Sequence, residues 1–308
     1  MRILITGGTG FIGKPLCAKL VGLGHRVTVI TRRKPDTAIA GSEGVDYFTA
    51  NLYEKPELPA AMLEETDVVI NLAGESIGAG RWTKAQKNRI VESRTRTTKA
   101  LVEAMAKAQK RPKLFINSSA VGYYGAHGDE ELDESAPAGD DFLATTCVQW
   151  EAEANKAKDL GLRLVILRTG VVLGRGGPAL QKMLLPFRLF IGGPIGSGRQ
   201  WLSWIHIDDL IALILFALEN EKIFGALNAT SPEPVTNKTF SKIIGKVLKR
   251  PSFMPVPAFV LKTALGEQSL LVLTGQRVLP QKALDMGFQF KYADPETALR
   301  AILASQNA

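Results

Sequence analysis

The feature that most constrains the fold is a glycine-rich turn near the start of the chain. Residues 2–6 are mostly apolar, and residues 7–13 contain glycine at four of seven positions. Apolar residues then recur at helical spacing as far as Leu23, and Gly24 ends the pattern. A strand that enters a helix through such a turn predicts a βαβ unit whose turn binds the pyrophosphate of a dinucleotide.

The glycines of this turn each have a physical reason. Gly7 allows the tight turn, Gly10 lets the backbone approach the pyrophosphate, and Gly13 lets the helix pack closely on the strand. The helix N-terminus then offers free N–H groups and the positive end of its dipole to the phosphates. We therefore expect the following cofactor contacts from the turn: Gly7, Thr9, Gly10, Phe11, Ile12 and Gly13.

The end of the second expected strand, residues 26–31, indicates which dinucleotide is bound. An NAD site usually places an Asp or Glu there, which accepts a hydrogen bond from the ribose 2′-hydroxyl. This chain has no acid before Asp36 and has Thr31, Arg32 and Arg33 instead. A guanidinium binds phosphate through two parallel hydrogen bonds, so Thr31 and Arg32 are expected to hold a 2′-phosphate, unless Arg32 is a solvated surface charge. The predicted cofactor is NADP(H).

Strands and helices alternate along the first half of the chain. Strands are expected at 2–6, 26–31, 45–50, 67–72, 114–117 and 163–167. One long helix should begin after an N-cap at Thr83 and reach about residue 109, and another should span 146–160. Strands separated by helices favour a parallel sheet covered on both faces. The predicted fold class is α/β, a Rossmann-type doubly wound parallel sheet with a smaller C-terminal α/β lobe.

The organisation changes after Gly174, where loops rich in glycine and proline separate the elements. Helices are expected at 179–190, 206–219, 236–250 and 295–304. We place an NADP-binding Rossmann domain at residues 1–175, to which 200–230 return. A smaller substrate-side lobe is placed at 176–308.

Composition argues against several classes of function. The net charge is +8, but Lys and Arg are scattered among acids without a basic stripe, which favours a small anionic ligand over nucleic acid. The longest apolar run, 210–218, is nine residues, whereas a membrane span needs about 20. The two distant cysteines and three separated histidines form neither a disulfide framework nor a zinc-binding spacing. We expect a cytoplasmic protein with a small-molecule substrate and no metal, nucleic-acid or membrane partner; a homodimer stays open.

The glycine turn and seven further segments together resemble a known family. The segments are 71–75, 118–125, 150–151, 170–174, 193–198, 204–210 and 280–284. They resemble the extended short-chain dehydrogenase/reductases, the NAD-dependent epimerase/dehydratase-like group. More specifically, they resemble its atypical subgroup of "epimerase family proteins", which carries a small C-terminal closing domain. The resemblance covers nearly the whole chain.

The resemblance implies further cofactor contacts beyond the turn. It places the end of the fourth strand under the adenosine and ribose, with the next loop and the long helix beside it. It places Val171 and Val172 near the nicotinamide carboxamide, although both side chains suit plain core packing. Arg94 on the long helix is either a cofactor contact or a solvated charge. The implied contacts are Leu72, Ala73, Gly74, Glu75, Arg94 and Val172.

The catalytic residues of this superfamily are only partly present. Its usual chemistry needs a Ser or Thr and a Tyr four residues before a Lys, which lowers the pKa of the Tyr. Ser119 fits the first role, with Ser118 as the alternative. Cys147 stands in the Tyr position and Glu151 in the Lys position. Glu cannot supply the missing positive charge, and a buried Cys is often a small apolar residue.

Other groups can take over the proton transfer. Tyr123 or Tyr124, just after the serines, has a suitable hydroxyl. Glu75 or Glu151 becomes a base if burial raises its pKa. The candidate catalytic residues are Ser119, Tyr124 and Cys147.

Two further segments suggest roles without fixing them. His206 precedes two Asp residues at a helix start, which is more typical of a structural hydrogen-bond centre than of an acid–base catalyst. The loop 192–198 and the following Arg199 suit a wall of the substrate pocket.

The residues together predict an NADP(H)-binding oxidoreductase or epimerase-like enzyme that acts on a small polar substrate. The alternative is a protein that binds NADPH without turnover, as a redox sensor or interaction protein. The missing Tyr and Lys favour the alternative, while the glycine turn fits both.

Overall fold

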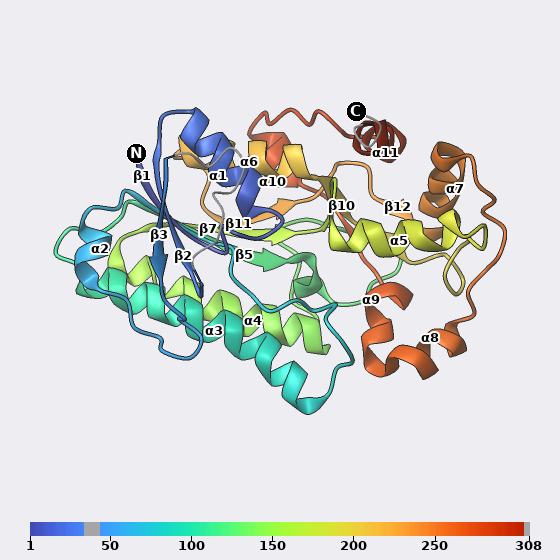
Figure 1. Cartoon of the computed structure of the whole chain (residues 1–308), viewed down its shortest axis with the longest axis horizontal. Helices are drawn as coiled ribbons and strands as arrows, with labels where there is room; N and C mark the ends of the chain where they lie inside the picture. Colours follow the sequence, from blue (N-terminus) through green and yellow to red (C-terminus); the bar gives the residue numbers. More distant parts are fainter. Residues whose placement is uncertain (34–43, 305–308) are drawn as a thin grey trace.

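The computed structural model describes residues 1–33 and 44–304, and its centre is a seven-stranded parallel sheet (Figure 1). Its strands are β1 (Arg2–Thr6), β2 (Arg26–Thr31), β3 (Val45–Thr49), β4 (Val68–Asn71), β5 (Leu114–Ala120), β7 (Arg163–Thr169) and β11 (Gly225–Ala229). Their order in space is β11-β7-β5-β4-β1-β2-β3. The order reverses between β1 and β4, which is where sheets of this kind bind ligands. The predicted doubly wound parallel sheet is confirmed.

Helices cover both faces of the sheet because successive strand residues point to opposite sides. Along β1, Ile3 and Ile5 enter one apolar core with α1 (Gly13–Gly22) and α6 (Ile207–Glu219). Leu4 enters a second core with α2 (Ala60–Glu64), α3 (Lys84–Lys107) and α4 (Phe142–Asn155). Figure 1 shows α1 and α6 above the sheet and α3 and α4 below it. The two cores fix where each helix presents its ends to the carboxyl edge of the sheet.

Side-chain caps set where the two long helices of the lower layer begin. The Thr83 hydroxyl accepts a hydrogen bond from the Gln86 amide, which confirms the predicted N-cap of α3. For α4 the predicted start at residue 146 is wrong by four residues, because Asp141 caps the helix by accepting from the Ala144 amide.

Within residues 1–33 and 44–304, no helix is long and apolar enough to cross a membrane.

The expected helix 146–160 also ends earlier than predicted. After α4 the chain forms the short 3₁₀ helix η2 (Lys158–Leu160) and turns at Gly161, which has a φ of +78°. The strands β5 and β7 extend two or three residues beyond the predicted ends, to Ala120 and Thr169. Their extra residues are polar or small, which hid their strand character, but they pair with each other in the sheet.

The C-terminal half adds a third apolar core beside the sheet. Outside the seven-stranded sheet, short strands pair as β8 (Val171–Leu173) with β10 (Trp204–His206), β9 (Trp201–Leu202) with β12 (Val235–Thr236), and β6 (Glu131–Leu132), from the first half of the chain, with β13 (Arg277–Val278). The third core contains residues of α5 (Pro178–Arg188), α7 (Asn237–Leu248) and α11 (Pro295–Ala304), whereas α10 (Gln281–Asp285) packs in the first core. The chain returns to the main sheet through α6 and β11, which pairs with β7.

One C-terminal segment is attached mainly by polar contacts. It comprises α8 (Ala258–Leu265), η3 (Gly266–Ser269) and α9 (Leu270–Leu273), and neither of its two α-helices has a buried residue. The Arg81 guanidinium donates to the carbonyl oxygens of Thr263 and Ala264, and Lys87 pairs with Glu267 at 2.6 Å. These contacts join the segment to the loop that follows β4 and to the start of α3. The segment therefore lies against the loop that leaves the carboxyl edge of the sheet.

Candidate functional site

The glycine turn lies at the carboxyl end of β1. Glycine is required at two of its positions because other backbone atoms lie too close to leave room for a Cβ. Gly7 has a φ of +73°, and a Cβ there would lie 2.7 Å from the backbone of Leu72. A Cβ on Gly13 would lie 2.2 Å from the Gly7 carbonyl oxygen. The Gly10 amide donates to that same oxygen at 3.0 Å, which closes the turn. Larger residues at Gly7 or Gly13 would force the turn apart.

The helix that follows the turn begins in a way that suits an anion. Within the described residues, α1 has no side-chain N-cap and no acidic residue in its first turn. Its first amides and its dipole therefore favour a phosphate group. Thr9, Phe11 and Ile12 are half-buried around this end. The Phe11 ring packs where a Cβ on Gly177 would lie, 2.9 Å from its Cζ.

The polar residues that follow β2 lie at the carboxyl edge of the sheet. Arg32 and Arg33 are exposed, and the Thr31 hydroxyl donates to the Arg33 carbonyl oxygen at 2.9 Å. This bond bends the backbone as it leaves the strand. Asp36 lies outside the described residues. Arg32 is therefore free of the core and available to a ligand at the ends of β1 and β2.

A buried amide network that sequence reasoning missed ties the strand ends together. The Asn71 Nδ2 donates to the Asn117 Oδ1 at 2.7 Å and to the Thr98 hydroxyl at 2.9 Å, and Thr6 donates to the Asn71 Oδ1 at 2.5 Å. Trp150 adds its indole N–H to the Thr98 hydroxyl. The sequence signal for this network was an Asn at the carboxyl end of the apolar run in each of two strands. The network fixes the start of the loop that contains Leu72, Ala73, Gly74 and Glu75.

The remaining predicted cofactor contacts lie on different elements at the same edge. Glu75 is half-buried, and its amide donates to the Ser93 hydroxyl on α3 at 3.0 Å. Arg94 is the next residue on that helix and lies against Gly74. Val172 is half-buried in β8, where it pairs with Ile205.

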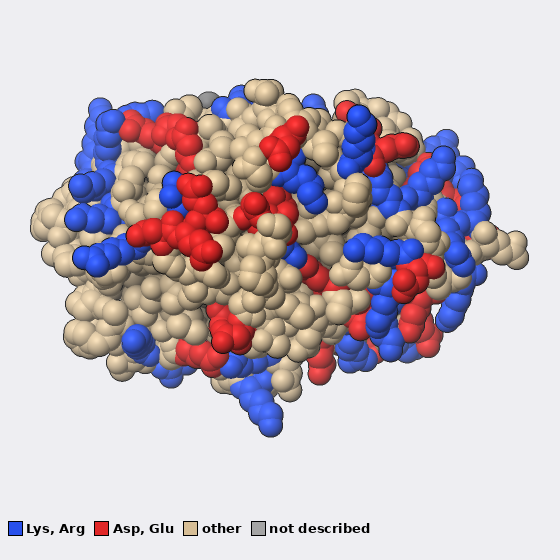
Figure 2. Space-filling model, turned by 180° about the vertical axis from the view of Figure 1, so that it is seen from behind, with Lys and Arg blue, Asp and Glu red and all other residues tan. Residues whose placement is uncertain are grey.

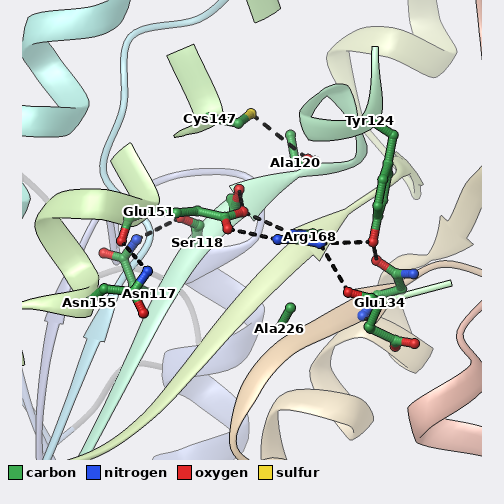
Figure 3. A network of polar contacts seen from close by, with 12 residues as sticks. Asn117, Ser118, Ala120, Tyr124, Glu134, Cys147, Glu151, Asn155, Arg168 and Ala226 are labelled. Carbon is green, nitrogen blue, oxygen red and sulfur yellow. Dashed lines mark hydrogen bonds and ion pairs between the residues drawn. The ribbon is translucent and has the colours of Figure 1, made fainter. Parts of the chain in front are cut away.

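Glu151 and Arg168 form a buried ion pair (Figure 3), to which Ser119 adds a hydrogen bond. The Ser119 hydroxyl donates to the Glu151 Oε1 at 2.6 Å. Arg168, at the end of β7, donates from Nε and Nη2 to the same carboxylate at 3.0 and 2.9 Å. The side chains of Arg168 and Glu151 are only 6% and 7% exposed. Glu151, in the position of the superfamily Lys, is thus held by its own counter-ion.

Arg168 is a functional-site residue that sequence reasoning did not single out. Its signal was a charged residue at the end of an apolar strand, which requires a buried partner. Burial opposes its charge, but the hydrogen bonds and the attraction of Glu151 raise the Arg168 pKa above its ordinary value. Its guanidinium also lies 3.4 Å from the ring centroid of Tyr123.

Tyr124 points away from Cys147, toward the far side of Arg168 (Figure 3). Its ring is fully buried, and its hydroxyl donates to the Asn228 Oδ1 at 2.7 Å and accepts from Arg168 at 3.1 Å. Burial raises the pKa of Tyr124 to about 12. The hydroxyl therefore stays protonated near neutral pH, with its proton donated to Asn228.

Cys147 is a buried thiol close to Ser119. Its Sγ donates to the Ala120 carbonyl oxygen at 3.8 Å. Burial, together with the negative charge of Glu151, raises the Cys147 pKa to about 11, although hydrogen bonding from Ser119 and the charge of Arg94 lower it. The predicted catalytic residues are thus brought together in part: Ser119 and Cys147 are neighbours, and Tyr124 is separated from them by Arg168.

This burial predicts an unreactive thiol. At pH 8 we expect a maleimide to modify neither Cys147 nor Cys17, whose pKa burial also raises to about 11, because only the thiolate reacts. The rate of maleimide modification should keep rising with pH up to about pH 11. Mass spectrometry of native and urea-unfolded protein gives the test, and the unfolded sample should take up two labels. Rapid native labelling of Cys147 at pH 8 would contradict the assigned burial.

His206 has a structural position. Its Nδ1 accepts from the Asp208 amide at 3.1 Å and thereby caps α6, while its ring packs 3.9 Å from that of Tyr292. Burial lowers the pKa of His206. No group of three or more His, Cys, Asp or Glu residues in the described ranges is arranged to hold a metal.

The loop 192–198 packs against the start of α7 and against Met254, which follows that helix. A Cβ on Gly193 would lie 2.0 Å from the Met254 carbonyl oxygen, and the Ile195 amide donates to the Asn237 side chain. The Trp201 indole N–H donates to Asp129 at 2.8 Å. These contacts give the loop a fixed shape beside β9.

Residues 3–229 match the NAD dependent epimerase/dehydratase family. The chain belongs to this family. Residues 256–302 of this epimerase/dehydratase family member match a domain of unknown function, DUF1731. The resemblance inferred from the motifs is confirmed, and the second match includes the C-terminal segment 280–284.

Relatives align with this epimerase/dehydratase family member over nearly its full length. The epimerase family protein YfhF of Bacillus subtilis (strain 168) is 43% identical over 307 residues, which is 99% of each chain. The epimerase family protein SDR39U1 of Homo sapiens is 40% identical over 308 residues, 99% of this chain and 100% of the relative. A crystal structure of human SDR39U1 (isoform 2) with NADPH superimposes with a TM-score of 0.86 at 38% identity, covering 99% of both chains.

Proposed function

We propose that this chain binds NADP(H) at the carboxyl edge of its sheet and acts there as an oxidoreductase or epimerase-like enzyme on a small polar substrate. The observation that carries the proposal is the turn between β1 and α1, in which Gly7 and Gly13 leave no room for a Cβ. An uncapped helix N-terminus beside it suits a pyrophosphate. The human relative with 38% identity was crystallised with NADPH, which supports the same cofactor here.

Different residues of the chain would bind different parts of the dinucleotide. The turn and the first amides of α1 would hold the pyrophosphate, and Arg32 with Thr31 would hold a 2′-phosphate. Gly74, in the loop after β4, and Val172, in β8, would border the rest of the dinucleotide. When bound, a nicotinamide supplies hydride transfer.

We assign proton transfer to Ser119 and its neighbours Cys147 and Glu151. Ser119 lies between Cys147 and Glu151, and its hydroxyl would donate to a substrate oxygen in exchange for its bond to Glu151. Cys147 is protonated and can donate a proton, which makes it a candidate acid. Tyr124, whose hydroxyl bonds Arg168 and Asn228, would act only after this network rearranges.

A second function, NADPH binding without turnover, is favoured by one observation. Cys147 and Tyr124 both have pKa values raised by burial, to about 11 and about 12, so neither is tuned to exchange protons near pH 7. Ser119→Ala distinguishes the two functions. An enzyme should lose about 10²-fold or more in NADPH oxidation with a carbonyl substrate panel and keep its NADPH affinity. A sensor should show no turnover in either variant.

The cofactor assignment is tested with Arg32→Ala. We expect the variant to lose about 10- to 100-fold in NADPH affinity, because charge-assisted hydrogen bonds to phosphate contribute about 1.5–3 kcal/mol. NADH affinity should change little. Nicotinamide fluorescence titrations measure both. Arg26→Ala is the matched control, because Arg26 is exposed at the opposite end of β2. Equal NADH and NADPH affinities in the wild type would reject the NADP(H) assignment.

A further inference from the structure

One end of the molecule exposes large apolar side chains. This end is formed by α5, α7 and α8 with the loops that follow α5 and α7, and Figure 1 shows it on the side away from α2. Six apolar residues there are 42–72% exposed, and we call them the apolar end: Phe190, Ile191, Phe253, Met254, Phe259 and Val260. Exposed apolar residues that gather in one place, rather than singly, mark a contact with a partner.

Backbone contacts hold the loops of the apolar end side by side. The Met254 amide donates to the Gly192 carbonyl oxygen at 3.2 Å, and the Val256 amide donates to the Pro194 carbonyl oxygen at 2.9 Å. The loop that follows α5 therefore runs beside the loop that follows α7, and α8 begins two residues after Val256. The apolar end is thus one connected part of the surface.

The helix α8 lacks the cover that its composition requires. Six of its eight residues are apolar, and none of the eight is buried. A helix that is apolar on most of its sides is normally buried in protein or in lipid. Phe190 has a φ of +63°, and its ring stays 56% exposed. That conformation is costly for a residue with a side chain, and burial of the ring does not offset the cost. Both features suit a partner outside the chain.

Positive charge is concentrated in the segments that form this end. Residues 171–207 and 234–266 contain ten Lys or Arg and no Asp or Glu, although the whole chain has a net charge of only +8. The acids of 208–233 separate the two segments in sequence, so no single basic block is visible there. Packing of α5 on α7 brings the segments together. Glu296 of α11 pairs with Lys246 and offsets one of the ten charges.

Exposed cations lie next to the apolar end. Lys249, Arg250 and Lys262 are all exposed, and each is within four residues of a member of the apolar end along the chain. The Arg250 guanidinium lies 4.3 Å from the centroid of the Phe190 ring. The same surface therefore offers apolar groups and positive charge to one partner.

We propose that the apolar end docks on the surface of an anionic lipid bilayer, where its six residues enter the headgroup layer and the neighbouring Lys and Arg bind anionic headgroups. Apolar residues flanked by cations are the combination that such a surface binds. A second copy of the chain fits less well, because a two-fold contact would place the same cations opposite one another. The expectation of no membrane partner depended on the lack of a spanning run, and surface contact requires none.

Flotation of the full chain with lipid vesicles tests the proposal. One set of vesicles contains equal parts of phosphatidylglycerol and phosphatidylcholine, and the other contains phosphatidylcholine alone. Phe259→Ser removes an exposed ring from α8. Its matched control is Phe224→Ser, because Phe224 is 66% exposed and precedes β11 at the amino edge of the sheet.

A second pair of variants tests the charges. Lys249→Gln with Lys262→Gln removes two cations beside the apolar end. Lys107→Gln with Lys110→Gln gives the same change in net charge, since both of these lysines are exposed where α3 ends. All the substituted side chains are exposed, and circular dichroism should show that every variant keeps the wild-type fold.

We expect the wild type to float with the anionic vesicles and not with phosphatidylcholine alone, and to be released as the salt concentration rises. Phe259→Ser and the Lys249/Lys262 variant should each bind about tenfold or more weakly, and both controls should bind as the wild type does. Absence of flotation with anionic vesicles, equal flotation with neutral ones, or wild-type binding by either test variant would overturn the proposal. A dimer in sedimentation that Phe259→Ser dissociates, without flotation of the wild type, would assign the surface to a second copy instead.

Discussion

Arg168→Met is expected to lower the free energy of unfolding by about 3–5 kcal/mol, because it leaves the buried carboxylate of Glu151 without its counter-ion. Both side chains are less than a tenth exposed, and among the described residues Glu151 would retain only the Ser119 hydroxyl as a side-chain partner. Tyr124 would also lose a donor to its hydroxyl oxygen. Urea unfolding followed by circular dichroism measures the loss.

Two further variants separate an unpaired charge from general damage to the core. Arg2→Met breaks the exposed pair of Arg2 with Glu65, which has a similar distance of 2.8 Å but exposed side chains, and should cost less than about 1 kcal/mol. The double variant Arg168→Met with Glu151→Leu removes both charges and should recover much of the loss, because apolar replacements of buried pairs are often tolerated. If the double variant is as unstable as the single one, the charge explanation is wrong.

Gly13→Ala is the second substitution with a large expected effect. It should lower both the free energy of unfolding and the affinity for NADPH. Its Cβ would lie 2.2 Å from the Gly7 carbonyl oxygen and 2.5 Å from the Gly8 Cα. Forcing a methyl group into such a contact costs about 1–3 kcal/mol. Because the displaced atoms form the phosphate turn, we expect NADPH affinity to fall by at least about tenfold, or 1.4 kcal/mol. Fluorescence titration and urea unfolding measure the two losses.

Gly22→Ala is the matched control on the same helix. A Cβ there meets no atom within 4 Å, and α1 ends at this residue. Alanine should raise the free energy of unfolding by roughly 0.5–1 kcal/mol, since glycine loses more backbone entropy in a helix. NADPH affinity should stay at the wild-type value. A Gly13→Ala protein that binds NADPH as Gly22→Ala does would show that the turn is not the phosphate site.

The space-filling view agrees with the charge pattern of the sequence. Figure 2 shows Lys and Arg residues interspersed with Asp and Glu over the visible face. A mixed surface of this kind offers no continuous basic stripe there for a nucleic-acid backbone. On this face the basic residues are thus accompanied by acidic ones.

The sequence by itself determined those features that depend on neighbours along the chain. The parallel sheet followed from apolar strands that alternate with helical periodicity, and the phosphate turn followed from glycine spacing between a strand and a helix. The N-cap at Thr83 was readable because the cap and its donor, Gln86, are three residues apart. The start of α4 was placed four residues late because the cap at Asp141 was not recognised in the sequence.

The tertiary structure alone decided how the polar groups of the site pair. Glu151 could be aligned with the superfamily Lys from sequence, but its counter-ion Arg168 is 17 residues away on another element. Tyr124 could be chosen as a proton donor, but its partner Asn228 lies 104 residues further on, in the edge strand β11. Such partners meet only because separate strands end at the same edge of one sheet. Their pairing depends on distances in space and on burial, which local periodicity does not encode.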